Sequence, residues 1–175
     1  MSDQRPRSQR PRSRGKGKGV DQAALERHQA SVQKLQEVLQ GEAESLRSIP
    51  HPEIVEKIRT RAVALAQAED DGDVTPVVDA ALDEIFGLGP LEPLLRDAEI
   101  KVIRLDGIHL YANSEPVLLG FRDDAHARGV IERILKSVGK QLSDTEAVRA
   151  EMMDGSVLVA ECVGPSLRMR ITRPS

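Results

Sequence analysis

The chain has 175 residues and a formal net charge of −3, with 39% apolar and 30% charged residues, and this length predicts one domain with appendages. Only Phe86, Tyr111 and Phe121 are aromatic, which argues against a stacking platform for single-stranded nucleic acid. The single cysteine, Cys162, excludes an intrachain disulfide or a cysteine-based zinc cluster and fits a reducing compartment.

Residues 1–19 differ in composition from the rest of the chain. They hold seven Lys or Arg against one Asp, a net charge of +6, so the remaining residues carry −9. Because this basic arm has no apolar residue after Met1, we expect it to be disordered. A solubilising tail is the simplest interpretation. Docking to an anionic membrane surface or to a partner is the second, and nucleic acid is the least favoured partner.

Residues 20–88 predict a helical region of three amphipathic helices. Apolar residues of the first recur at spacings of three, four and seven, which places them on one face. Prolines mark the boundaries, because proline disfavours helical angles in the residue before it and suits the first turn of the next helix. Asp21 and Thr75 are the expected N-caps. The expected helices are residues 21–48, 52–69 and 75–87.

A connector rich in proline, glycine and leucine follows, with the sequence GLGPLEPLL at residues 87–95. Its glycines and prolines predict a rigid, non-helical start, and its four leucines make it apolar. We expect this segment to pack the helical region against a sheet. The residues expected to hold it there are Gly89, Pro90, Leu91, Pro93, Leu94 and Leu95.

Residues 89–175 predict an α+β domain, a mainly antiparallel sheet with one helix packed on one face. Asp-Gly pairs at 106–107 and 154–155 are hairpin signals, and Asp123 is the expected N-cap of the helix. The expected strands are residues 99–105, 108–112, 117–121, 148–153, 157–163 and 167–172, and the expected helix is 124–138.

The last expected strand and its end carry three arginines. Alternation along the strand places Arg168 and Arg170 on one face, and Arg173 follows just past the end. These side chains are positioned to converge on an anion. A solvated strand face that balances the acidic body is the simpler alternative.

The sequence contains no catalytic constellation. None of its Gly-Lys pairs precedes Ser or Thr, so a phosphate-binding loop is missing. Neither Ser143 nor Ser156 lies in a Gly-x-Ser-x-Gly context. We therefore expect binding and positioning of a partner without ATP turnover, cofactor or metal. The histidines share no ligand spacing and are expected at the surface: His28, His51, His109 and His126.

Four segments occur in an order that resembles the CpaF/TadA family of type II/IV secretion ATPases. The resemblance covers residues 75–173 and, more loosely, 21–74. The four segments are GLGPLEPLL at 87–95, FRDDAH at 121–126 leading into a helix that ends IERILKSVG at 131–139, the Asp-Gly-Ser hairpin at 154–156, and LRMRIT at 167–172.

In that family the matching region is an N-terminal, PAS-like α+β module preceded by helices, and a RecA-like ATPase domain follows it. The resemblance implies a non-catalytic protein–protein interaction or assembly module, cytoplasmic or peripheral at the inner face of the membrane. Its implied partners are secretion or pilus motor subunits, in a homo-oligomer such as a hexamer or in a hetero-complex. It also implies that Arg170 and Arg173 contact nucleotide phosphate, with weak ATP binding only together with an ATPase domain.

Two alternatives stay open. In the first, the chain is the N-terminal part of an active secretion ATPase whose catalytic domain is missing here. In the second, it is a cytoplasmic adaptor or regulator with this fold. Asp106-Gly107 replaces the family's Asn-Gly, and the loop at 163–165 is shortened. Both departures indicate a divergent member or a stand-alone relative.

Overall fold

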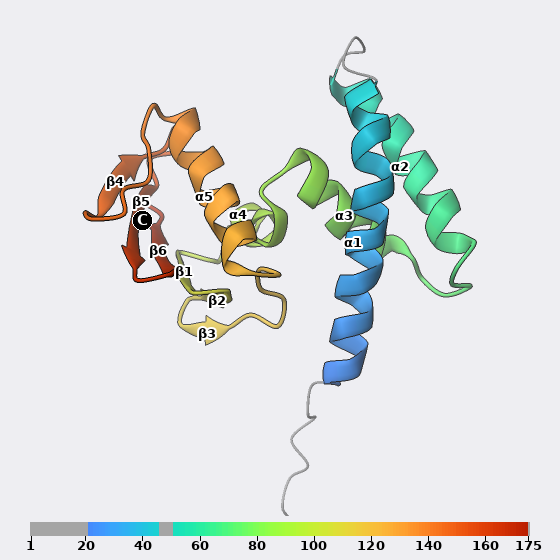
Figure 1. Ribbon diagram of the computed structural model, residues 1–175, viewed down its shortest axis with the longest axis horizontal. Helices are drawn as coiled ribbons and strands as arrows, with labels where there is room; N and C mark the ends of the chain where they lie inside the picture. The colour runs from blue at the N-terminus through green and yellow to red at the C-terminus, as the bar shows by residue number, and fades with distance from the viewer. Residues whose placement is uncertain (1–20, 46–50, 175) are drawn as a thin grey trace, which may run out of the picture.

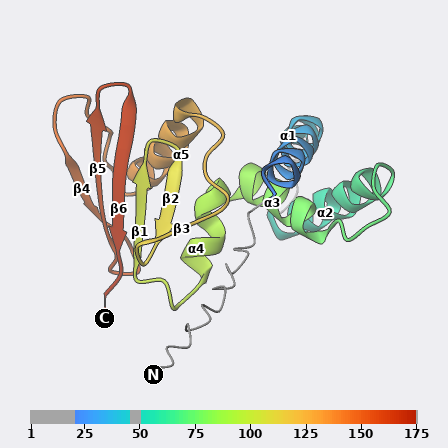
Figure 2. The ribbon, with the colours of Figure 1, turned by 90° about the horizontal axis from the view of Figure 1, so that it is seen from below.

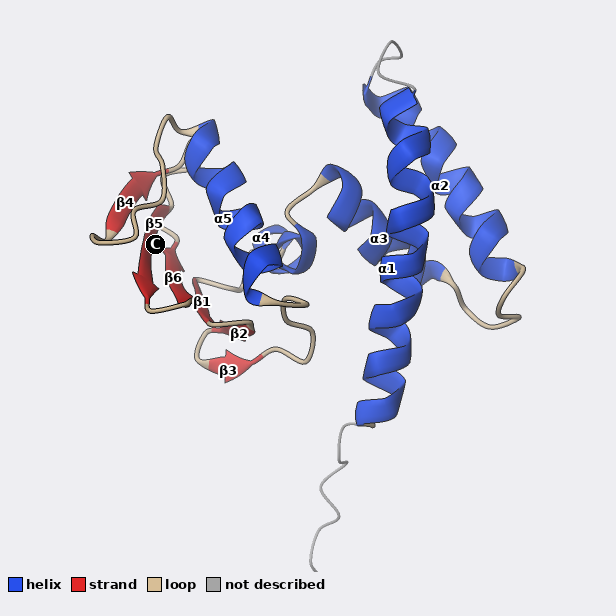
Figure 3. Cartoon of the chain, in the orientation of Figure 1, coloured by secondary structure: helices blue, strands red, loops and turns tan. Residues whose placement is uncertain are grey.

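The computed structural model describes residues 21–45 and 51–174, and the fold is α+β. A unit of three helices lies at one end of the molecule and a six-stranded sheet at the other (Figure 1). Figure 3 shows the strands gathered at one end of the molecule, with α5 beside them and the longer helices at the other end. The arm at 1–19 and the predicted helix end at 46–48 lie outside the described residues.

The helices are α1 (Gln22–Ser45), α2 (His51–Gln67), α3 (Thr75–Phe86), the 3₁₀ helix η1 (Gly89–Leu91), α4 (Glu92–Arg96) and α5 (Asp124–Ser137). The strands are β1 (Val102–Asp106), β2 (His109–Ala112), β3 (Glu115–Pro116), β4 (Val148–Glu151), β5 (Val157–Val163) and β6 (Ser166–Thr172). Among the described helices, none has the length and apolar character needed to cross a membrane.

Helices α1, α2 and α3 bury one apolar stripe each against the others. Asp21 Oδ1 accepts the N–H of Ala24 at 3.3 Å, which confirms the predicted cap of α1. The predicted cap of α3 is wrong: Thr75 is already helical, and Asp73 Oδ1 accepts its N–H at 3.0 Å. The core residues are Val32, Leu35, Leu39, Ala43, Ile54, Ile58, Ala62, Ala66, Val78, Ala81 and Leu82.

The sheet is antiparallel, with strand order β3-β2-β1-β6-β5-β4. The strands before α5 and those after it form two blocks, which join where β1 pairs with β6. Helix α5 covers the face of the sheet that points toward the three-helix unit (Figure 2). The opposite face carries the exposed, alternate residues of the strands, as in β6, where residues 168, 170 and 172 are exposed.

The third strand is shorter than predicted and lies just before the predicted segment. Only Glu115–Pro116 is a strand, and the predicted strand at 117–121 is a loop. The N–H of Val117 donates to Leu110 O at 2.9 Å, and that of Phe121 donates to Ile108 O at 2.9 Å. The step of two residues from Leu110 back to Ile108 is therefore matched by a step of four residues, from 117 to 121, on the loop side, so a regular ladder cannot continue there.

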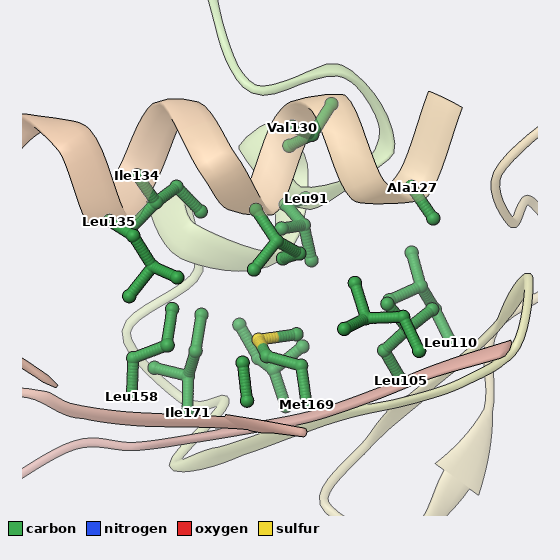
Figure 4. Packing of buried hydrophobic residues seen from close by; sticks show 14 of the residues in the cluster. Leu91, Leu105, Leu110, Ala127, Val130, Ile134, Leu135, Leu158, Met169 and Ile171 are labelled. Atoms are coloured by element: carbon green, nitrogen blue, oxygen red, sulfur yellow. The ribbon is translucent and has the colours of Figure 1, made fainter. Parts of the chain in front are cut away.

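A second core lies between α5 and the sheet, and the connector contributes to it. Figure 4 shows Leu91 between α5 and the sheet, among apolar side chains from both layers. Leu91 and Leu94 are buried, at 0% and 8% exposed, Leu95 is half-buried, and Pro93, also expected to hold the connector in place, is exposed. Its start at 87–88 is non-helical as expected, but the residues after it form η1 and α4.

We expect Asp123→Ala to destabilise the α+β domain by about 1 kcal/mol at pH 7, because the N-cap of α5 is lost. Asp123 Oδ1 accepts the N–H of His126 at 2.7 Å, and this bond together with Arg122 lowers the pKa of Asp123. The stabilisation is thus present above the ordinary pKa of 3.8 and is lost as the pH falls through the lowered value. Urea unfolding at several pH values measures it.

Asp123→Asn is the matched control for that experiment. Asparagine caps helices about as well as aspartate but does not titrate. Its stability should therefore stay close to that of the wild type at pH 7, while the difference between the wild type and Asp123→Ala shrinks below about pH 4. An acid-independent difference between the wild type and Asp123→Ala would contradict the assignment.

Candidate functional site

A row of arginines crosses the uncovered face of the sheet. The register places Arg104 directly opposite Tyr111 on one side and Arg170 on the other. The same row continues from Arg170 to Val159 and from Val159 to Arg149. These five residues, one from each of five neighbouring strands, are called the arginine row below.

Arg104 and Arg170 occupy directly paired positions of β1 and β6. The N–H of Gly107 donates to Leu167 O at 2.9 Å, so those two residues form a hydrogen-bonded pair of the β1–β6 ladder. Arg104 and Arg170 lie three positions further along, and hydrogen-bonded and non-hydrogen-bonded pairs alternate in an antiparallel ladder. They are therefore a non-hydrogen-bonded pair, the kind in which side chains approach most closely.

Arg168, the neighbouring arginine on β6, is paired with a carboxylate, whereas the arginines of the row are not. Arg168 Nε lies 3.2 Å from Asp106 Oδ1, and Glu161 is its partner on the other side. Among residues 21–45 and 51–174, no ion pair involves an arginine of the row. The guanidinium of Arg104 instead lies 5.1 Å from the centre of the Tyr111 ring, a cation–π contact. The row thus presents positive charge that an anion could neutralise.

A shallow hollow of about 580 Å³ lies over β1, β5 and β6 on this face. Four residues of the row line it, and its other lining residues include Arg168 and two carboxylates. The lining residues are Arg104, Leu105, Asp106, Tyr111, Val159, Glu161, Arg168, Met169 and Arg170. Tyrosine and arginine are the residue types that most often carry binding energy at protein interfaces. Three arginines against two carboxylates leave the hollow with a net positive charge, which suits an anionic partner group.

Arg173 does not join Arg170. Its guanidinium donates to the carbonyl oxygens of Leu95, Asp97 and Ile100, the last at 3.1 Å. It is half-buried and ties the end of the connector to the end of β6. The structure therefore places Arg104 beside Arg170 and Arg149 two strands away in the same row, and gives Arg173 a structural contact with backbone.

The junction between the two units is built on α3 and the connector. Asp83 is 7% exposed and pairs with Arg96 of α4 at 2.7 Å. Burial raises the pKa of Asp83, and the hydrogen bond from Arg96 opposes that shift. Further along, Gly89 has a φ of +56°, and a Cβ there would lie 3.0 Å from the Glu84 carboxylate, so this position requires glycine.

His126 links α5 to α3 and corrects the expectation that it lies at the surface. Only 15% of its side chain is exposed, and its Nε2 lies 2.8 Å from Glu84 Oε2. Its Nδ1 accepts the N–H of Arg122 at 3.3 Å. The proton of the neutral ring is therefore on Nε2, which donates to Glu84. A hollow of about 400 Å³ between α1, the connector and the loop before α5 opens beside this pair.

Comparison with known proteins leaves the family open. No protein-family model matches the chain, and no curated protein matches it. Within the part of the chain that the structure describes, no three His, Cys, Asp or Glu side chains are grouped as a metal would need. The residues of the two sites are therefore interpreted from their own geometry.

The sequence reasoning missed Arg104, Arg149 and the Glu84–His126 pair. Alternation within the predicted strands could have placed Arg104 and Arg149 on faces of their own strands. Which strands become neighbours is a long-range property, so the alignment of these residues with Arg170 had no local signal. The same holds for Glu84 and His126, which lie 42 positions apart.

Proposed function

We propose that this chain is a non-catalytic interaction and assembly module of a type II/IV secretion or pilus motor. The observation that supports the proposal most is the uncovered sheet face with its arginine row, a surface suited to an anionic partner. The sequence resemblance to the N-terminal region of secretion ATPases supplies the biological setting. The proposed location is the cytoplasm, free or at the inner face of the membrane.

The packing of the connector supports an assembly role. Leu91 and Leu94 insert into the core beside α5, and Asp83–Arg96 and Glu84–His126 bridge the two units. A partner bound at the sheet face is therefore held at a defined position relative to the three-helix unit. Fixed spacing of this kind is what an assembly module needs in order to orient its neighbours.

Size-exclusion chromatography with a secretion ATPase of the same organism tests the proposal. We expect the chain to co-elute with the motor subunit, alone or as a homo-oligomer, because a module of this kind acts through partners. A chain that stays monomeric and never co-elutes with motor subunits contradicts the proposal and favours the adaptor alternative. An open reading frame that continues to a phosphate-binding loop would instead support the alternative of an active ATPase.

The nucleotide contact expected of Arg170 and Arg173 stays a prediction for the complex with an ATPase domain. Arg170 is free of ion pairs among the described residues, whereas Arg173 is held by three carbonyl oxygens. If either arginine senses phosphate, Arg170→Ala should weaken ATP binding by the complex more than Arg173→Ala does. Unchanged affinity in both variants contradicts the contact.

A further inference from the structure

We propose that the uncovered sheet face binds the acidic turn between α2 and α3, residues 69–73, of a second copy of this chain. Copies would then associate head to tail through the arginine row of one and the acidic turn of the next. The inference rests on the proposed function, because an assembly module needs contacts with neighbouring subunits, and it names the partner of the same surface.

The acidic turn concentrates charge at an exposed position. The segment EDDGD at 69–73 carries four carboxylates in five residues, and every one of these residues is exposed. Glu69 is paired with Lys34 of the same chain. Hydrogen bonds from Thr75 lower the pKa of Asp73, so its charge persists below the usual range. Asp70 and Asp71 make no ion pair within the described residues.

The two surfaces are complementary in charge. Arg104 and Arg170 of the row line a hollow of about 580 Å³, together with Arg168 and the carboxylates Asp106 and Glu161, so the hollow carries three positive and two negative charges, whereas the exposed turn carries four carboxylates. A guanidinium can bind a carboxylate through two parallel hydrogen bonds, which fixes orientation as well as position. Like charges directly opposite in a sheet are destabilising, so a carboxylate placed between Arg104 and Arg170 also relieves their repulsion.

The two surfaces lie at opposite ends of the molecule. Figure 1 places the loop after α2 at the right-hand end and the sheet at the left-hand end, and Figure 2 shows α5 between the sheet and the helices. One copy therefore cannot bring its own turn to its own row. Contact between two different patches is heterologous, and it closes into a ring or continues as a filament, depending on the rotation between copies.

Sedimentation velocity of the full chain tests the contact. We expect self-association that weakens about tenfold or more as NaCl rises from about 20 mM to about 500 mM, since exposed ion pairs are screened. Reversing the row with Arg104→Glu/Arg170→Glu, or the turn with Asp70→Lys/Asp71→Lys, should each weaken association by about tenfold or more. An equimolar mixture of the two variants should regain it, because each supplies the surface complementary to the other.

A charge-matched control and a folding check accompany these variants. Lys136→Glu/Lys140→Glu changes the net charge by the same amount as the row reversal, but it lies on α5 and just beyond it and should leave association unchanged. Arg170→Glu alone places opposite charges on the directly paired positions 104 and 170. It should therefore melt at or above the wild type.

Three results would overturn the inference. The first is a mixture of the reversed variants that does not regain association. The second is loss of association on deleting residues 1–19, because the basic arm would then be the partner of the turn. The third is dissociation by millimolar ATP, because the row would then be a phosphate site. If the chain does not self-associate but still binds the motor subunit, only this inference is refuted. If it self-associates but does not bind the motor subunit, only the proposed function is contradicted.

Discussion

Leu91→Ala is expected to destabilise the α+β domain by about 2–5 kcal/mol, because it leaves a cavity that rigid surroundings cannot fill. Leu91 is fully buried between α5 and the sheet, among side chains that come from both layers (Figure 4). For a domain of this size, such a loss should lower the melting temperature by about 10 °C or more. Scanning calorimetry and urea unfolding followed by far-UV circular dichroism measure it.

Leu118→Ala is the matched control, since it makes the same chemical change at a leucine that is 62% exposed. Its effect should stay within about 0.5 kcal/mol. A Leu91→Ala variant that melts together with the Leu118→Ala variant would show that the connector is not part of the core. The assembly role proposed for the chain would then lose the fixed spacing between its two units.

Gly120→Ala is expected to cost about 1–3 kcal/mol through a clash with backbone. A Cβ on Gly120 would lie 2.4 Å from the carbonyl oxygen of Ile108, which also accepts the N–H of Phe121. Backbone cannot rotate away as a flexible side chain can, so the loop must move off β2. Phe121 is 2% exposed and follows directly, so its packing should loosen as well.

The same substitution at Gly129 should have the opposite sign. Gly129 lies within α5, and a Cβ there would meet no atom within 4 Å. Alanine is favoured over glycine inside a helix by about 0.5–1 kcal/mol, so Gly129→Ala should raise stability. Calorimetry on the two variants side by side separates a steric cost from a general effect of replacing glycine. Equal shifts in the same direction would contradict the close contact at Gly120.

Local sequence determined much of the fold. Helical periodicity and the Asp123 cap predicted α5, Asp-Gly pairs predicted two hairpins, and the leucines of the connector predicted its burial at Leu91 and Leu94. These features depend on residues a few positions apart, where spacing alone decides which side chains share a face. The prediction of a strand at 117–121 was wrong because this segment has two more residues than the stretch it pairs with. That mismatch depends on the pairing, which local sequence does not reveal.

Only the tertiary structure decided what the two candidate sites contain. Pairing of β1 with β6 places Arg104 opposite Arg170 across 66 positions of sequence, and the arrangement of the two units brings His126 of α5 to Glu84 of α3. Alternation along the last strand correctly predicted that Arg170 is exposed, but it could not show that Arg173 turns back onto the connector. Periodicity fixes the face on which a side chain lies, whereas the neighbour across that face depends on which distant segments pack together to bury the core.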